Sequence, residues 1–62
     1  MNNCCIKEKG KDNYFRGWDR FGEMVMQPGE KYAYRMTRTL SARTMEKLEA
    51  EKGISCEILK VS

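Results

Sequence analysis

The segment SARTMEKLEAEKG, at residues 41–53, carries the clearest structural signal in the chain. Ser41 is a good helix N-cap, because its hydroxyl can accept a hydrogen bond from the free amides of the first turn. Leu40 and Met45 have the spacing of a hydrophobic staple, in which the residue before the cap packs on the first turn. The final glycine suits the left-handed conformation that commonly ends a helix. The segment therefore predicts one helix, at about residues 41–52.

The expected helix has a buried stripe of Met45 and Leu48, with Ala42 and Ala50 at its edges. The chain continues as ISCEILKV, residues 54–61, in which apolar and polar residues first alternate. This period predicts a half-buried strand. A second helix capped by the serine is the competing interpretation, but too few residues follow for a stable helix.

A turn signal precedes the helix at QPGE, residues 27–30. Proline presets φ at the second turn position, and glycine accepts the positive φ that a type II turn requires at the third. The flanking segments 23–26 and 31–39 therefore predict an antiparallel hairpin. Residues 4–9 and 14–21 predict two earlier strands, the second interrupted by a glycine.

Together these elements predict a single α+β domain over residues 1–62. We expect a small antiparallel or mixed sheet of three to five strands, with the helix packed on one face. One helix shields only one face of such a sheet. The other face is then expected to be solvated, to self-associate or to bind a partner.

The composition excludes several classes of function. The chain has no histidine, which removes Ser-His and Cys-His nucleophiles and an imidazole base. It also lacks the glycine-rich phosphate-binding loops. Three cysteines without a C-x-x-C pair are fewer than the four ligands of a structural zinc site. We predict a protein that is not an enzyme, with no catalytic residue, no metal site and no cofactor.

Membrane insertion and secretion are not expected either. No run approaches the roughly 18 apolar residues of a membrane helix, and the first residues lack the basic and apolar regions of a signal peptide. We therefore predict a cytoplasmic protein. Its cysteines are then interpreted as thiols in a reducing compartment that act as small buried hydrophobic residues.

The segment YFRGWDRFG, residues 14–22, holds four of the six aromatic residues together with two arginines. We interpret Phe15 and Phe21 as core residues, since a small sheet protein needs large side chains there. Tyr14 and Trp18 have polar tips that need water or a partner. Trp, Tyr and Arg are enriched at protein–protein hot spots, and aromatic residues interleaved with arginine also stack on unpaired bases.

Positive charge is concentrated ahead of the helix, in a chain whose net charge is only +3. Residues 31–43 contain four basic side chains and no acidic one. A basic stripe on the open face of the sheet would attract phosphates or an acidic protein. The alternative is that these charges occupy solvated strand positions and discourage edge aggregation.

Four methionines lie beyond the first residue. We interpret them as gap-filling core residues. The alternative is an adaptable apolar surface that forms a homodimer. The four are Met24, Met26, Met36 and Met45.

A small scaffold rich in aromatic and arginine side chains, without a catalytic set, predicts a non-catalytic binding module. We expect it to dock on a larger protein partner as an inhibitor or adaptor. The alternative is a nucleic-acid-binding regulator that uses a basic and aromatic face of the sheet. The predicted partner-binding residues are Tyr14, Arg16, Trp18, Arg20, Tyr34, Arg35 and Arg38.

Overall fold

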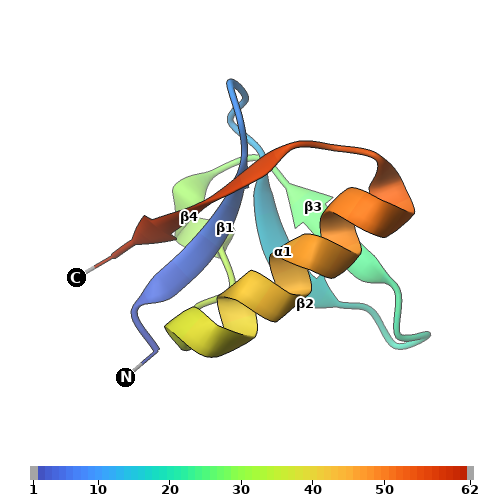
Figure 1. Ribbon diagram of the computed structural model, residues 1–62, viewed down its shortest axis with the longest axis horizontal. Helices are drawn as coiled ribbons and strands as arrows, with labels where there is room; N and C mark the ends of the chain where they lie inside the picture. Colours follow the sequence, from blue (N-terminus) through green and yellow to red (C-terminus); the bar gives the residue numbers. More distant parts are fainter. Residues whose placement is uncertain (1, 62) are drawn as a thin grey trace.

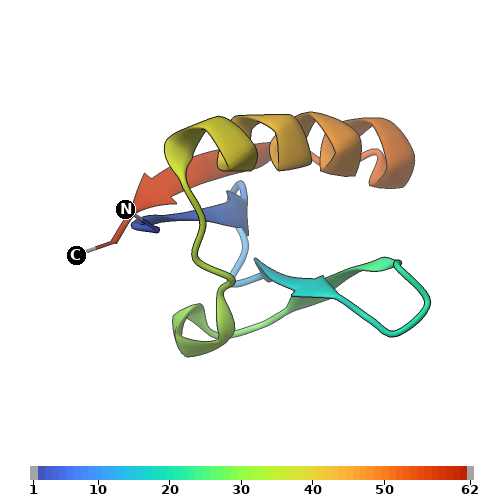
Figure 2. The same ribbon diagram turned by 90° about the horizontal axis from the view of Figure 1, so that it is seen from below.

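The computed structural model describes residues 2–61, which form a four-stranded antiparallel sheet and one long helix. The sheet order is β3-β2-β1-β4, so β3 and β4 are its edges (Figure 1). Helix α1 packs on β1 and β4 (Figures 1 and 2). This arrangement confirms the predicted α+β sheet with one helix on one face. The elements are β1 (Cys4–Glu8), β2 (Tyr14–Trp18), β3 (Met24–Gln27), the 3-10 helix η1 (Glu30–Tyr32), α1 (Arg38–Lys52) and β4 (Cys56–Lys60).

Strand β1 pairs with β4 along its whole length but meets β2 only at Lys7 and Tyr14. The two central strands therefore diverge, and a later part of the chain enters between them. Met36 exchanges two backbone hydrogen bonds with Cys4, at 3.0 and 2.9 Å. This bridge joins the segment before α1 to the start of β1, and the Met36 side chain is buried there.

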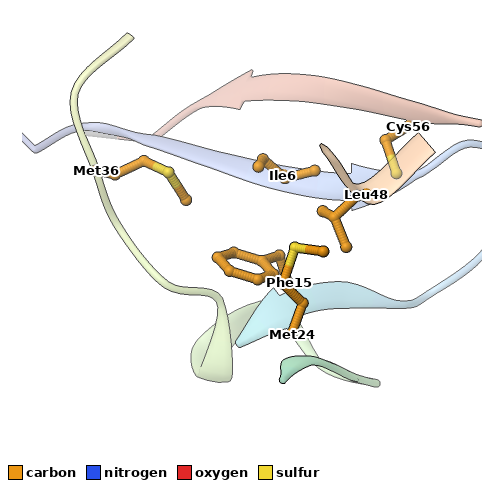
Figure 3. Close-up of a cluster of buried hydrophobic side chains, with 6 residues drawn as sticks. All are labelled: Ile6, Phe15, Met24, Met36, Leu48 and Cys56. Carbon is orange, nitrogen blue, oxygen red and sulfur yellow. The ribbon is translucent and has the colours of Figure 1, made fainter. Parts of the chain in front are cut away.

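The hydrophobic core fills the space between two layers (Figure 3). One layer consists of α1, β1 and β4, and the other is the β2–β3 hairpin. Phe15 is fully buried there, as predicted, and the methionines fill the space around it. Phe21 is not a core residue, because it lies in the β2–β3 turn and is 77% exposed. The buried cluster consists of Ile6, Phe15, Met24, Met36, Leu48 and Cys56.

The helix begins one turn earlier than the sequence predicted. Thr37 is the N-cap, and its side chain accepts a hydrogen bond from the Leu40 N–H at 3.2 Å. Ser41 instead lies inside the helix and donates its hydroxyl to the Arg38 carbonyl at 2.7 Å. The staple is also absent, because Leu40 is a helical residue that is 42% exposed. The C-terminal end is confirmed, with Gly53 in the left-handed conformation at φ 66°.

The buried stripe of α1 is more polar than predicted. Ser41, Thr44 and Leu48 are buried, Met45 is half-buried, and Ala42 and Ala50 are both exposed. The two hydroxyl groups tolerate burial because each donates to a carbonyl of the preceding turn. The alanine prediction was wrong because the core-facing stripe is narrow: it follows positions 41, 44, 45 and 48, and positions 42 and 50 lie outside it.

The expected hairpin around Pro28 and Gly29 does not form. Strand β3 pairs with β2 instead, through a turn in which the Asp19 carboxylate accepts the N–H groups of Phe21 and Glu23 at 2.8 and 2.9 Å. Residues 31–39 do not add to the free edge of β3, because Tyr34 bonds to Phe15 of β2 and Met36 bonds to Cys4 of β1. They form η1, an extended segment and the start of α1. The predicted strands at 4–9, 14–21 and 54–61 are confirmed with shorter bounds.

The face of the sheet opposite the helix is partly covered, contrary to expectation. Neighbouring residues on a strand point to opposite faces, yet Cys4 and Cys5 are both buried. Tyr14 lies on the Cys5 side and is only 6% exposed. Burial raises the pKa of the Cys5 thiol and of the Tyr14 hydroxyl, and Glu30 of η1 lies close enough to raise both further. The segment that carries η1 therefore occupies this side of the sheet and leaves less of it open.

Candidate partner-binding surface

Three aromatic rings form a mutually packed cluster at the edge of the core. Phe15 lies edge to face against Trp18, with centroids 5.0 Å apart, and against Tyr34, with centroids 6.1 Å apart. Trp18 and Tyr34 also meet edge to face at 5.7 Å. Phe15 is buried, whereas Trp18 is 46% exposed and Tyr34 is 41% exposed. The buried ring thus holds two half-exposed rings in fixed orientations.

Gly17 makes this cluster possible. It lies at the irregularity in the β2–β3 pairing and has φ 122°, which side chains other than hydrogen rarely permit. The Tyr34 N–H donates to the Phe15 carbonyl at 2.8 Å, which places the Tyr34 ring over this glycine. A Cβ at position 17 would lie 3.4 Å from the ring. The backbone of β2 therefore forms part of the floor under Tyr34.

A hollow of about 370 Å³ lies beside Trp18. Its lining includes one basic residue, Arg16, and one acidic residue, Asp19, together with apolar Val25 of β3. The Asp19 carboxylate is held by two backbone N–H groups, so its charge is fixed in place. We call Arg16, Trp18 and Tyr34 the aromatic–arginine patch. The hollow is lined by Arg16, Gly17, Trp18, Asp19 and Val25.

The predicted binding residues do not all belong to this patch. Tyr14 is buried, so its ring cannot form a contact surface; burial, and then Glu30, raises its pKa. Arg20 lies over the Phe21 ring, 5.0 Å from its centroid, in the β2–β3 turn. Arg35 lies on the η1 side of the sheet, near enough to oppose the rise in the Cys5 pKa that burial and Glu30 cause. Arg38 begins α1.

The arginines are available to a partner. All five arginine side chains are exposed, and among the described residues the ion pairs are Lys7–Glu57 and Lys11–Glu8, neither of which uses an arginine. An exposed guanidinium without an internal partner can pair with a carboxylate or phosphate without first breaking a bond. Sequence reasoning selected four of these five arginines, all except Arg43, but it missed the supporting roles of Gly17 and Phe15.

Burial affects the thiol chemistry of two of the three cysteines, Cys5 and Cys56. Cys4, Cys5 and Cys56 are free and buried. Burial is the first cause that raises the pKa of Cys5 and Cys56, followed by Glu30 for the former and Glu49 for the latter. Since the thiolate is the reactive form, these two thiols are held in their inert form near neutral pH.

Residues 2–61 contain neither a metal-binding cluster nor a membrane-spanning helix. No group of three or more potential metal-binding side chains comes together there. No helix in that range combines the length and apolar character needed to cross a bilayer. Comparison of the chain with protein-family models, curated proteins and solved structures gives no match.

Proposed function

We propose that this protein is a non-catalytic binding module that docks on a larger protein partner through the aromatic–arginine patch, in the manner of an inhibitor or adaptor. The observation that carries the proposal is the pair of half-exposed rings, Trp18 and Tyr34, packed on buried Phe15 beside an arginine-lined hollow. Trp, Tyr and Arg are the residue types that dominate binding energy at protein interfaces.

The packing of the rings favours binding because it reduces the entropy lost on association. Each side chain immobilised at an interface costs about 0.5–1.5 kcal/mol. Trp18 and Tyr34 are already held edge to face against each other and against Phe15 before a partner arrives. The patch therefore presents large apolar area at a low ordering cost.

The charge beside the patch favours a protein over a nucleic acid. The hollow next to Trp18 is lined by both Arg16 and Asp19, two residues of opposite charge. A carboxylate at this position weakens attraction for phosphate but can accept hydrogen bonds from a polypeptide. Each of Trp18 and Tyr34 also has part of its surface covered by the other ring, which leaves less room for stacked bases.

The test is affinity capture from extract of the source cell, followed by binding measurements with the purified partner. We expect Trp18→Ala to weaken the complex by at least about 2 kcal/mol, roughly 30-fold, as for a hot-spot residue. Leu40→Ala is the matched control, because Leu40 is similarly exposed but lies on α1 away from the patch. Equal losses for the two variants, with both still folded, would show that the patch is not the docking surface.

A nucleic-acid-binding regulator is the second candidate, and the exposure of all five arginines favours it. Its signature is affinity for mixed single-stranded oligonucleotides that falls steeply as salt rises. Fluorescence anisotropy at about 50 mM salt measures this directly. An unchanged signal removes this candidate, whereas tight salt-sensitive binding with no captured protein would replace the first proposal.

Cytoplasmic action is part of the proposal. Three buried, unbridged cysteines fit a reducing compartment. Homodimerisation is tested separately by light scattering at high protein concentration. A dimer whose formation is abolished by Trp18→Ala would mean that the patch binds a second copy of this chain.

A further inference from the structure

A second hollow lies on the other side of the molecule, between the start of α1 and the end of β4. Its volume is about 300 Å³. Helix α1 touches the beginning of β4, where the Cys56 N–H donates to the Glu49 carboxylate at 3.1 Å. Towards the first turn of α1 the helix and β4 diverge over β1 (Figure 1). The hollow is lined by Asn3, Cys4, Arg38, Ile58 and Lys60.

The lining combines an apolar floor with a positively charged rim. Cys4 is buried and Ile58 is half-buried, and both lie on the helix side of the sheet because Cys4 pairs with Lys60 in the β1–β4 register. Arg38 and Lys60 are exposed and come from different elements. Within residues 2–61 neither forms an ion pair, and no acidic side chain lines the hollow. Two exposed cations beside an apolar floor can attract an anionic group that has an apolar part.

The backbone beside the hollow is also open to a ligand. The Lys9 N–H donates to Ser55 and the Val61 N–H donates to Asn3, so odd-numbered residues of β4 direct their backbone groups towards β1. Alternation then directs the backbone groups of Ile58 and Lys60 to the outer edge of the sheet. The outward-facing N–H of Cys56 donates to the Glu49 carboxylate. Among the described residues, no side chain accepts from the outward-facing N–H groups of Ile58 and Lys60, next to the hollow.

We propose that this hollow binds a carboxylate attached to an apolar group. Arg38 and Lys60 pair with the carboxylate, the Asn3 side-chain amide is placed to donate to it, and Cys4 and Ile58 contact the apolar part. A free aliphatic acid and the C-terminal residue of a peptide share this chemistry. A peptide gains additional hydrogen bonds if its preceding residues pair with the free edge of β4. The site shares no residue with the aromatic–arginine patch, so it stands independently of that proposal.

The first test is an NMR titration of the ¹⁵N-labelled protein with N-acetyl-leucine. We expect the amide signals of Ile58 and Lys60 to shift, with a dissociation constant of about 1 mM for a ligand of this size. N-acetyl-leucinamide has the same shape without the charge, and we expect it to bind at least about 10-fold more weakly because charge-assisted hydrogen bonds are lost. Equal effects of acid and amide would overturn the proposal, and so would the absence of shifts at these two residues.

The second test assigns the charge to named residues. Arg38→Gln and Lys60→Gln are each expected to weaken N-acetyl-leucine binding several-fold. Arg43→Gln is the matched control, since Arg43 is exposed on the same helix but does not line the hollow. All three are surface changes, and circular dichroism verifies the fold. Unchanged affinity in both Arg38→Gln and Lys60→Gln would contradict the assignment.

The final test separates the two sources of the ligand. A pentapeptide with a free C-terminal leucine is compared with N-acetyl-leucine and with the same peptide carrying N-methylated amides. Tighter binding of the unmethylated peptide alone indicates a peptide C-terminus that pairs with β4. Equal affinity of all three indicates a site for small aliphatic acids.

Discussion

Gly17→Ala is the sharpest test of how the surface around Trp18 is built. Gly17 has φ 122°, and alanine in a sparsely populated positive-φ region costs about 1–3 kcal/mol. The added methyl group would also contact the Tyr34 ring at 3.4 Å. That distance is an ordinary van der Waals contact, so the strain comes from the backbone, and we expect a loss of about 1–3 kcal/mol. For a domain of this size a loss of about 2 kcal/mol lowers the Tm by roughly 8–16 °C.

The matched control is Gly22→Ala in the β2–β3 turn. Gly22 has φ 80°, but a Cβ there would meet nothing within 4 Å. We expect a loss of about 1–2 kcal/mol from the left-handed strain, with no new contact to an aromatic ring.

Urea unfolding followed by circular dichroism measures both stabilities. The chain has one tryptophan, so native-state fluorescence reports on the cluster itself. We expect Gly17→Ala to shift the Trp18 emission and Gly22→Ala to leave it unchanged. Equal losses of stability with identical emission spectra would refute the conclusion that Gly17 supports the Tyr34 ring.

Three further predictions test the helix start, the thiols and the core. Thr37→Ala should lower the free energy of unfolding by about 0.5–2 kcal/mol, because it removes the N-cap acceptor. Ser41→Ala should cost less, because Ser41 lies inside the helix. A larger loss for Ser41→Ala in urea unfolding would instead indicate that Ser41 is the N-cap. Stability should fall as the pH rises above about 8.5, since the raised pKa of Cys5 and Cys56 keeps the native thiols protonated while the unfolded ones ionise. Thermal unfolding between neutral and alkaline pH measures this, and Cys56→Ala should reduce the slope. Met36→Ala should lower the free energy of unfolding by about 2–5 kcal/mol, because the side chain is fully buried. A loss below about 1 kcal/mol in urea unfolding would contradict the conclusion that Met36 is a core residue.

The fold class and the final helix–strand unit could be predicted because their signals are local. Gly53 ends α1 through its own backbone preference, and the alternation after it matches β4. The helix start could not be fixed in the same way, because Thr37, Thr39 and Ser41 are all acceptable N-caps in sequence. The choice among them depends on Met36, whose bridge to Cys4 fixes where the chain leaves the sheet.

The hairpin was mispredicted because pairing is a non-local property. The alternation of Tyr32, Tyr34 and Met36 is typical of a strand, but only Met36 forms a bridge. The segment instead bonds to the two central strands, since the Tyr34 N–H donates to Phe15 of β2 and Met36 bridges Cys4 of β1. The bond to Phe15 places Tyr34 at the edge of the core beside Trp18, and not on the strand face that the sequence predicted. The residues of the patch were therefore identifiable from type, whereas their assembly was not.

Net charge understates the positive potential that this protein offers to a partner. Several acidic side chains are held in local hydrogen bonds: Asp19 in the β2–β3 turn, Glu49 on the first amide of β4, and Glu8 on the side chain of Asn13. The arginines, by contrast, are all exposed and outside the observed ion pairs of residues 2–61. Screening limits exposed charges to interactions over about 8–10 Å, so a distant fixed carboxylate does little to neutralise an arginine on another face. Positive charge is therefore locally uncompensated at the hollow lined by Arg38 and Lys60, whereas Asp19 lies beside Arg16 at the aromatic–arginine patch, in a chain whose net charge is +3.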